Sequence, residues 1–156
     1  MGQTLQSGVE VSSDAARLDV DAVHAFLSQS YWSPGIPREV LDRALKNSLC
    51  FGAYEGSRQV GFARVVTDRA TFAWLCDVFV IESHRRRGIA DALMGAVKSH
   101  PELQGLRRWS LATRDAHPLY RRHGFLPLAD SAPAMEIRRP NVYQEGGDRS
   151  QGKSQT

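Results

Sequence analysis

The apolar run at residues 70–81 and the basic loop that follows it place the strongest constraint on the fold of this chain. Only Asp77 interrupts the run with a charge, which predicts a central strand buried on both faces. The loop at residues 84–90 then leads into a helix whose apolar side chains recur at helical spacing, with Ile89 and Leu93 on one side. The sequence therefore predicts a buried strand, a tight basic turn and an amphipathic helix in direct succession.

A turn of this kind favours the binding of an anion. The first N–H groups of a helix have no partner within the helix and carry the positive end of its dipole. Gly88 and the small Ala90 would let a phosphate approach the main chain, while residues 85–87 supply positive charge. We therefore expect a phosphate or pyrophosphate at this loop, the alternative being an ordinary solvated helix start with a basic face.

The spacing within the loop selects among the known phosphate motifs. A P-loop needs two glycines followed by Lys and Ser or Thr, and a dinucleotide fingerprint needs three spaced glycines, so neither pattern is present. Residues 85–90 instead fit the pattern Arg/Gln-x-x-Gly-x-Gly/Ala. This segment resembles the acyl-CoA pyrophosphate loop of the GNAT (Gcn5-related N-acetyltransferase) superfamily.

A second motif follows the loop in the chain, at residues 111–125. It resembles the GNAT pattern Asn-x-x-Ala-x-x-Leu-Tyr-x-x-x-Gly-Phe, although Thr113 stands where that pattern usually has Asn. The matching residues are Ala116, Leu119, Tyr120, Gly124 and Phe125. Because two motifs occur in the expected order and setting, the chain is identified as a member of the GNAT superfamily, and residues 47–53 and 70–80 resemble one small stand-alone branch whose acceptor is not characterised.

The organisation along the chain predicts an α+β fold with the order β-α-α-β-β-β-α-β-α-β-β. We expect a loose segment at residues 1–7, a single domain at 8–138 and a polar, disordered tail at 139–156. The sheet should be mixed and mostly antiparallel, with helices on both sides, but residues 70–81 and 106–112 are joined through a helix and should run parallel. The other strands are expected at residues 8–12, 48–54, 59–66, 125–128 and 134–137, with a hairpin turn at residues 55–58. Two early helices are also expected, one capped by Asp19 and the next beginning at Pro37.

Composition excludes several classes of protein. The chain has 156 residues and contains no apolar stretch of 18, so no membrane span or membrane partner is expected. Most of the net charge of +3 lies in residues 138–156, which disfavours a nucleic-acid-binding face on the domain. Cys50 and Cys76 lie in apolar runs and are interpreted as reduced thiols of a cytoplasmic protein, and no Cys/His spacing indicates a metal site.

The resemblance to GNAT proteins implies where acetyl-CoA would lie. In that family the acyl-CoA occupies the gap where the two parallel strands splay apart, and its pantetheine arm pairs with the backbone of the first strand. Here that backbone is the segment formed by Val78, Phe79 and Val80. The pyrophosphate would then bind the loop formed by Arg85, Arg86, Arg87, Gly88, Ile89 and Ala90.

Two catalytic candidates follow, Tyr120 from the resemblance and Asp77 from its place as the only carboxylate in the central strand. Tyr120 would assist the leaving thiolate, but a thiol titrates near 8.5 and a phenol near 10, so we expect a hydrogen bond in which full proton transfer is not required. The alternative is that Tyr120 is a half-buried structural aromatic. Asp77 is a candidate general base, because burial raises a carboxyl pKa, and the equally weighted alternative is a structural Asp paired with a neighbouring strand or Arg. Cys76, Glu82 and His117 are weaker candidates for the base, and an amine that arrives neutral would need none.

The acceptor is expected between the two early helices and the strand ends. Tyr31, Trp32 and Trp74 would shape an apolar or cation-binding wall there, unless they serve only as core or lid packing. The leading hypothesis is an N-acetyltransferase that moves an acetyl group from acetyl-CoA to a small primary amine. The alternatives are a protein lysine or N-terminal acetyltransferase and a non-catalytic acyl-CoA sensor. A homodimer is compatible with the resemblance, but no element of the sequence requires one.

Overall fold

The computed structural model describes residues 3–5 and 8–144, and its centre is a six-stranded sheet with the order β1-β2-β3-β4-β5-β6. Neighbouring strands are antiparallel except β5 and β6, which are parallel. The predicted α+β class with a mixed, mostly antiparallel sheet is therefore confirmed. The strands are β1 Gln3–Thr4, β2 Val9–Ser12, β3 Leu49–Glu55, β4 Arg58–Thr67, β5 Phe72–Val80 and β6 Arg108–Ser110.

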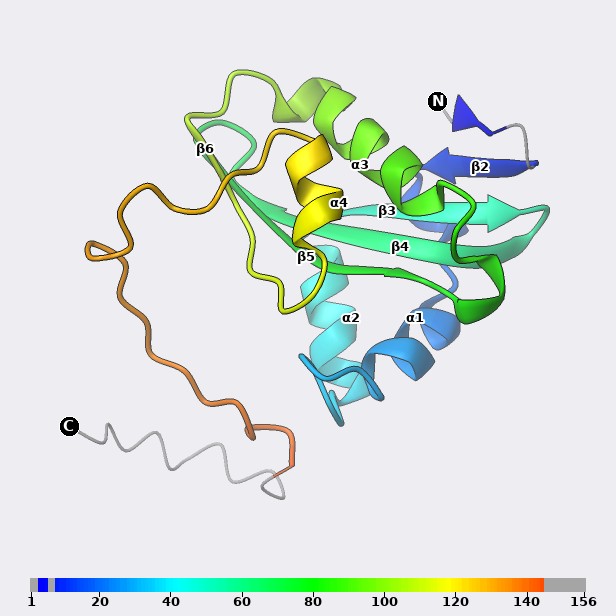
Figure 1. The fold of residues 1–156 in the computed structure, drawn as a ribbon. Helices are drawn as coiled ribbons and strands as arrows, with labels where there is room; N and C mark the ends of the chain where they lie inside the picture. The colour runs from blue at the N-terminus through cyan, green and yellow to red at the C-terminus, as the bar shows by residue number, and fades with distance from the viewer. Residues whose placement is uncertain (1–2, 6–7, 145–156) are drawn as a thin grey trace.

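Helices cover both faces of this sheet (Figure 1). The α-helices are α1 Val20–Leu27, α2 Arg38–Lys46, α3 Ile89–Ser99 and α4 His117–Arg122, and short 3-10 turns lie at η1 Ala15–Arg17, η2 Glu82–His84 and η3 Pro101–Leu103. Asp19 begins α1 as expected, since its carboxylate accepts a hydrogen bond from the Ala22 N–H at 3.0 Å. The sequence-predicted hairpin between β3 and β4 is also present, with Gly56 at a φ of 60°.

Two hydrophobic cores result, one on each face of the sheet. Helix α3 buries Ile89, Leu93, Met94 and Val97 against the first face, which is the amphipathic stripe read from the sequence. Helices α1 and α2 cover the other face with the buried side chains Val23, Leu27 and Leu41. Burying side chains of this kind stabilises the fold by about 1.5–3 kcal/mol each.

A β-bulge bends β5 in the middle of the sheet. Arg64 of β4 pairs with Cys76 and Phe62 pairs with Phe79, so two residues of β5, Asp77 and Val78, lie opposite one residue of β4. Asp77 takes a φ of 54°, in the left-handed region. The extra residue turns the strand, which is the usual structural effect of a bulge.

The two parallel strands stay together over only a short length. Residues 72–74 of β5 pair with residues 108–110 of β6, but β5 then continues to Val80 while β6 ends at Ser110. The edge of β5 beyond Trp74 is therefore not paired with β6. The GNAT resemblance implies an acyl-CoA site where two parallel strands splay apart, and the divergence of β5 from β6 is a feature of that kind.

The C-terminal part of the chain departs from the prediction. Residues 125–128 and 134–137 form no strand in the described structure, so the expected order ends after α4. The apolar alternation is present, but a strand also needs a neighbour for its backbone hydrogen bonds. The backbone hydrogen bonds of this segment are local, from the Phe125 N–H to the Tyr120 carbonyl and from the Ala134 N–H to the Ser131 carbonyl.

The ends of the expected domain also contain observed structure. Gln3–Thr4 pairs with β2, within the segment expected to be loose. At the other end Tyr143 packs against the core beneath α1 and α2, and a Cβ built on Gly35 would lie 3.6 Å from its carbonyl oxygen. Residues 1–2, 6–7 and 145–156 lie outside the described residues, and so does that part of the expected tail.

Candidate active site

The loop between β5 and α3 turns through two left-handed residues. Arg86 has a φ of 64° and Gly88 a φ of 76°, and Gly88 is the N-cap of α3 without a side-chain cap. Such turns direct successive N–H groups toward one point and produce a concave anion site. The first helical bond runs from the Ala92 N–H to the Gly88 carbonyl, so the amides before Ala92 receive no intrahelical acceptor.

A cavity of about 190 Å³ opens at this loop. It is lined by the end of β5, the loop, the first turn of α3 and one residue of α4: Val80, His84, Arg85, Arg86, Gly88, Ile89, Ala90, Asp91 and Arg122. Arg87 lies apart from this lining, because its guanidinium is 4.0 Å from Glu55 of β3. The combination of free amides and guanidinium groups suits a pyrophosphate.

An ion-pair cluster fixes α4 beside this loop. The Arg122 guanidinium donates to both carboxylate oxygens of Asp91, at 3.2 and 3.1 Å, and His123 Nε2 lies 2.8 Å from the same carboxylate. The hydrogen bond from Arg122, with that from His123, lowers the pKa of Asp91 despite some burial. The sequence does not reveal Asp91 and Arg122 as site residues, since their contact joins positions far apart in the chain.

Tyr120 lies buried on α4, in the same hydrophobic core against which Val78 and Val80 of β5 pack. Thr113 positions the start of this helix, because its hydroxyl accepts a hydrogen bond from the Ala116 N–H at 3.1 Å. Phe125 packs edge-on against the Tyr120 ring at 6.0 Å. Burial, with the charges of Tyr31 and Asp115, raises the pKa of Tyr120 to about 12. The phenol is therefore protonated at neutral pH and available as a donor.

Both carboxylate oxygens of Asp77 are engaged within the protein. Arg64 Nε donates to one oxygen at 2.7 Å and Trp32 Nε1 donates to the other at 2.8 Å. Burial lowers the pKa of Arg64, but the negative charge of Asp77 and its hydrogen bond raise it by more, so the Arg64 pKa is raised overall. This geometry favours the structural alternative for Asp77 over the role of general base.

The aromatic residues predicted to line the acceptor site lie partly together. Tyr31 packs edge-on against Trp32 at 5.0 Å, and both follow α1 on the side of Asp77. Arg114, which precedes α4, stacks on the Tyr31 ring at 3.8 Å and its N–H donates to the Tyr31 hydroxyl at 3.4 Å. Trp74 lies on β5 opposite Val66 and remains partly exposed. The sequence does not reveal Arg114 as a site residue, because its contact with Tyr31 joins positions far apart in the chain.

Val78, Phe79 and Val80 occupy the unpaired stretch of β5. Phe79 is buried and stacks on Phe26 of α1 at 3.9 Å, while Val78 and Val80 face the core beneath α3. These side chains anchor the strand on both faces, and its backbone edge faces the gap left by β6. Among the described residues no three His, Cys, Asp or Glu side chains gather into a metal site, and no described helix is long and apolar enough to cross a membrane.

Comparison with known proteins places this geometry in a family. A model of the acetyltransferase (GNAT) domain matches residues 46–127. A protein of Gibberella zeae assigned as an acetyltransferase is 34% identical over 134 residues, which span 70% of this chain and 74% of that protein. A crystal structure from Xanthomonas campestris, assigned to the same family, has 50% identity and a TM-score of 0.86, and the match covers 90% of this chain and 99% of that one.

A more distant structure shares the fold. The Clostridium acetobutylicum protein crystallised with acetyl-CoA has a TM-score of 0.61 at 11% identity, and the match covers 94% of this chain and 99% of that one. The fold and the matches define a protein of the acetyltransferase class. More narrowly, this chain belongs to the GNAT family.

Proposed function

We propose that this protein transfers the acetyl group of acetyl-CoA to the primary amine of a small molecule. The observation that carries the proposal is the alignment of three features along β5. The cavity at the start of α3 lies at the end of the strand, the edge of β5 that β6 does not pair comes next, and the buried Tyr120 shares a core with Val78 and Val80 of that strand. Acyl transfer from a thioester needs a site that holds the cofactor, a hydrogen-bond donor to the oxyanion and a donor to the leaving sulfur. The cavity, the backbone of β5 and Tyr120 would supply these three in turn.

The cofactor is proposed to bind through the main chain. The diphosphate would receive the free amides at residues 88–91 and the guanidinium groups of Arg85, Arg86 and Arg122. Gly88 and the small Ala90 leave room for this approach, since nothing lies within 4 Å of a Cβ at Gly88, and the Ile89 side chain is buried in the core. The side chain of Arg87 would contribute charge at a greater distance. The pantetheine arm would lie along Val78, Phe79 and Val80, where a backbone N–H would polarise the thioester carbonyl.

Tyr120 is proposed to stabilise the departing sulfur. With a pKa raised to about 12, its phenol lies well above an ordinary thiol near 8.5. A complete proton transfer to the thiolate would therefore be uphill. The phenol would act by donating a strong hydrogen bond as charge develops, and solvent would protonate the thiolate after release.

Asp77 is proposed to position the acceptor rather than to take its proton. Its contact with Trp32 fixes that indole beside Tyr31, and Trp74 extends the same side of the sheet. Arg114 links the loop before α4 to Tyr31 and narrows the acceptor side, which supports a small molecule over a protein lysine or N-terminus. The free thiols of Cys50 and Cys76 support a reducing location such as the cytoplasm.

Two measurements on the full chain test the proposal. Calorimetric titration with acetyl-CoA measures binding, and coupled CoA release measures turnover on pooled small primary amines and, separately, on lysine-containing peptides. We expect binding, with release on the small amines. Binding without any release would indicate an acyl-CoA sensor, release on peptides alone would indicate a protein acetyltransferase, and absence of binding would overturn all three functions.

A further inference from the structure

Arg114 lies on the acceptor side of the site with its charge unpaired. Its guanidinium is exposed and stacks on the Tyr31 ring at 3.8 Å. Among residues 3–5 and 8–144 no carboxylate forms an ion pair with this guanidinium, whereas Arg64, a second cation on this side, is paired with Asp77. Stacking on a ring holds the face of a guanidinium and leaves its N–H edge free, and that edge forms a fork that matches a carboxylate. Arg114 is therefore suited to bind an anionic group of a ligand.

Tyr31 determines how near Arg114 lies to the reacting groups. The backbone N–H of Arg114 donates to the Tyr31 hydroxyl at 3.4 Å. Burial raises the pKa of Tyr120, and the charge of Tyr31 raises it further, so the two phenols lie within electrostatic reach of each other. One tyrosine side chain thus separates Arg114 from the phenol proposed to act at the sulfur. A ligand with its amine beside Tyr120 would place a second group at Arg114 if a short carbon segment joins the two.

The next residue in the same loop carries the opposite charge. The Asp115 carboxylate also acts on the Tyr120 phenol, after burial and Tyr31, so it lies near the same region. No ion pair joins Asp115 to Arg114 in the part of the chain that the structure describes. Neighbouring charges that do not pair with each other complement a ligand that carries both signs. The carboxylate of such a ligand would meet Arg114, and its ammonium group would be attracted by Asp115 before it loses its proton.

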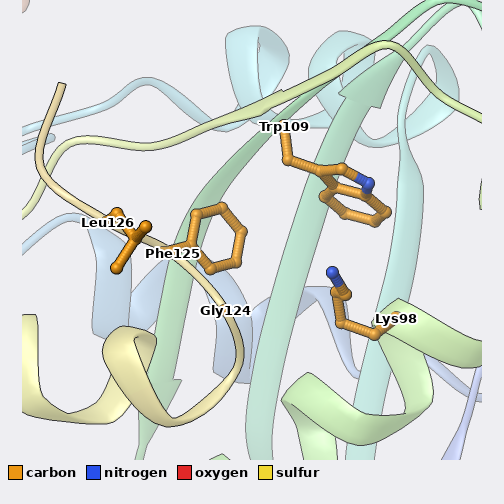
Figure 2. Close-up of a pocket in the computed structure, with 5 residues that line it drawn as sticks. All are labelled: Lys98, Trp109, Gly124, Phe125 and Leu126. Carbon is orange, nitrogen blue, oxygen red and sulfur yellow. The ribbon is translucent and has the colours of Figure 1, made fainter. Parts of the chain in front are cut away.

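A second cavity, of about 250 Å³, lies on the other face of the sheet, beside α3. Figure 2 shows its lining, formed by Lys98, Trp109, Gly124, Phe125 and Leu126. The Lys98 ammonium lies over the Trp109 ring at 5.2 Å and over the Phe125 ring at 5.9 Å. The acceptor side instead adjoins the core beneath α1 and α2, since Trp32 packs against Phe26 of that core at 6.4 Å. Lys98 is therefore not placed to bind the anionic group of an acceptor.

We propose that the acceptor is an amino acid, whose carboxylate binds Arg114 and whose amine is acetylated beside Tyr120. The inference rests on the proposed function and narrows its acceptor to small amines that also carry a carboxylate. The carbon segment between the two groups lies against Tyr31 and Trp32, whose side chains are 47% and 39% exposed. The amine nitrogen forms the new C–N bond with the thioester carbonyl carbon, the C–S bond breaks with its electron pair on sulfur, and the surplus proton of the amine passes to solvent.

The first test compares amino acids with their own carboxamides on the full-length protein. CoA release at saturating acetyl-CoA is measured for glycine, β-alanine, γ-aminobutyrate and L-phenylalanine, each beside its amide, which keeps the amine and removes the negative charge. For at least one pair we expect kcat/KM to be about tenfold or more higher for the acid. This preference opposes the intrinsic trend, because a carboxylate keeps a nearby amine protonated more of the time. Phosphoethanolamine tests phosphate in place of carboxylate, and its selection over every amino acid would overturn the proposal.

The second test identifies the residue that binds the carboxylate. Arg114→Gln should raise KM for the preferred amino acid by about tenfold or more, change KM for its amide by about twofold or less, and leave the calorimetric Kd for acetyl-CoA unchanged. Arg114→Lys keeps the charge without the planar fork and should recover part of the affinity. Arg121→Gln is the matched control, because it removes an exposed positive charge from α4, and we expect the wild-type KM for both members of the pair.

The outcomes separate this inference from the function on which it rests. Equal activity on acids and amides, or an Arg114→Gln variant that weakens both members of a pair equally, overturns the amino-acid acceptor and leaves acetyl transfer to small amines in place. Binding of acetyl-CoA without CoA release on any member of the panel also overturns the amino-acid acceptor. Absence of acetyl-CoA binding overturns the proposed function itself and the inference with it.

Discussion

Replacing Asp77 by Asn removes one charge from a buried contact while keeping the shape of the side chain. The side chains of Asp77 and Arg64 are only 6% and 18% exposed, so the guanidinium of Arg64 would remain largely out of water without its counterion. Asn occupies the left-handed backbone region about as readily as Asp, so the φ of 54° adds no separate strain. The measured change therefore reports the lost charge together with one lost hydrogen bond, because Arg64 and Trp32 donate to different oxygens of Asp77 and the Asn amide offers only one acceptor oxygen.

The size of the effect follows from the partners that remain. Removing one member of a buried ion pair costs about 3–5 kcal/mol. Arg64 keeps a hydrogen bond to the Ser48 hydroxyl at 3.0 Å and some contact with water, which reduces the expected loss to about 2–3 kcal/mol of unfolding free energy. For a chain of this size the corresponding decrease in Tm is about 5–10 °C.

Urea unfolding of the wild type and the Asp77→Asn variant checks this value. Asp42→Asn is the matched control, since it removes a carboxylate from an exposed pair with Arg38 and should change the free energy of unfolding by about 0.5 kcal/mol or less. Adding Arg64→Met to Asp77→Asn should restore part of the loss, with a coupling of about 2 kcal/mol. Equal effects of Asp77→Asn and Asp42→Asn, or additive effects in the double variant, would refute the reasoning.

Three further predictions concern tyrosines. Tyr120→Phe should lower kcat by about 10–100-fold with little change in the Kd for acetyl-CoA measured by calorimetry, and unchanged turnover would exclude its role at the sulfur. Tyr54→Phe should leave the free energy of unfolding in urea unchanged or raise it by up to about 1 kcal/mol, because the buried Tyr54 hydroxyl has no hydrogen-bond partner among the described residues, and a clear loss would contradict this. Burial raises the pKa of both phenols to about 12, so the folded state keeps protons that the unfolded chain releases near 10. The free energy of unfolding should therefore fall between about pH 10 and 12, and less steeply in either Phe variant, as chemical denaturation at fixed pH would measure.

The features predicted well from the sequence depend on short-range spacing. The turn at Gly88 and the start of α3 follow from a small residue, a basic loop and a helical stripe that are contiguous in the chain. The cap at Asp19 and the hairpin at Gly56 are equally local. The parallel pairing of β5 and β6 could be expected as well, because a helix that connects two strands of one sheet carries the chain back to the end at which the first strand began.

The features missed depend on contacts between distant residues. Asp77 could be recognised as an isolated charge in a buried strand, but its role is set by Arg64 on β4 and Trp32 after α1. The bond between Asp91 and Arg122 likewise joins two helices. The strands expected at residues 125–128 and 134–137 are absent for the same reason. Alternation of apolar residues identifies a possible strand face, but it does not identify the neighbouring strand with which the segment must pair.

The bulge at Asp77 gives β5 an unequal tolerance to changes in length. Ala73 and Leu75 before the bulge and Val78 and Val80 after it all face α3, because the extra residue shifts the alternation by one position across the bend. Deleting one residue at the bulge would leave a regular strand with every inward side chain still inward. A deletion at any other position of β5 would turn part of the strand inside out, so evolutionary gain or loss of a residue in this strand should be confined to positions 76–77.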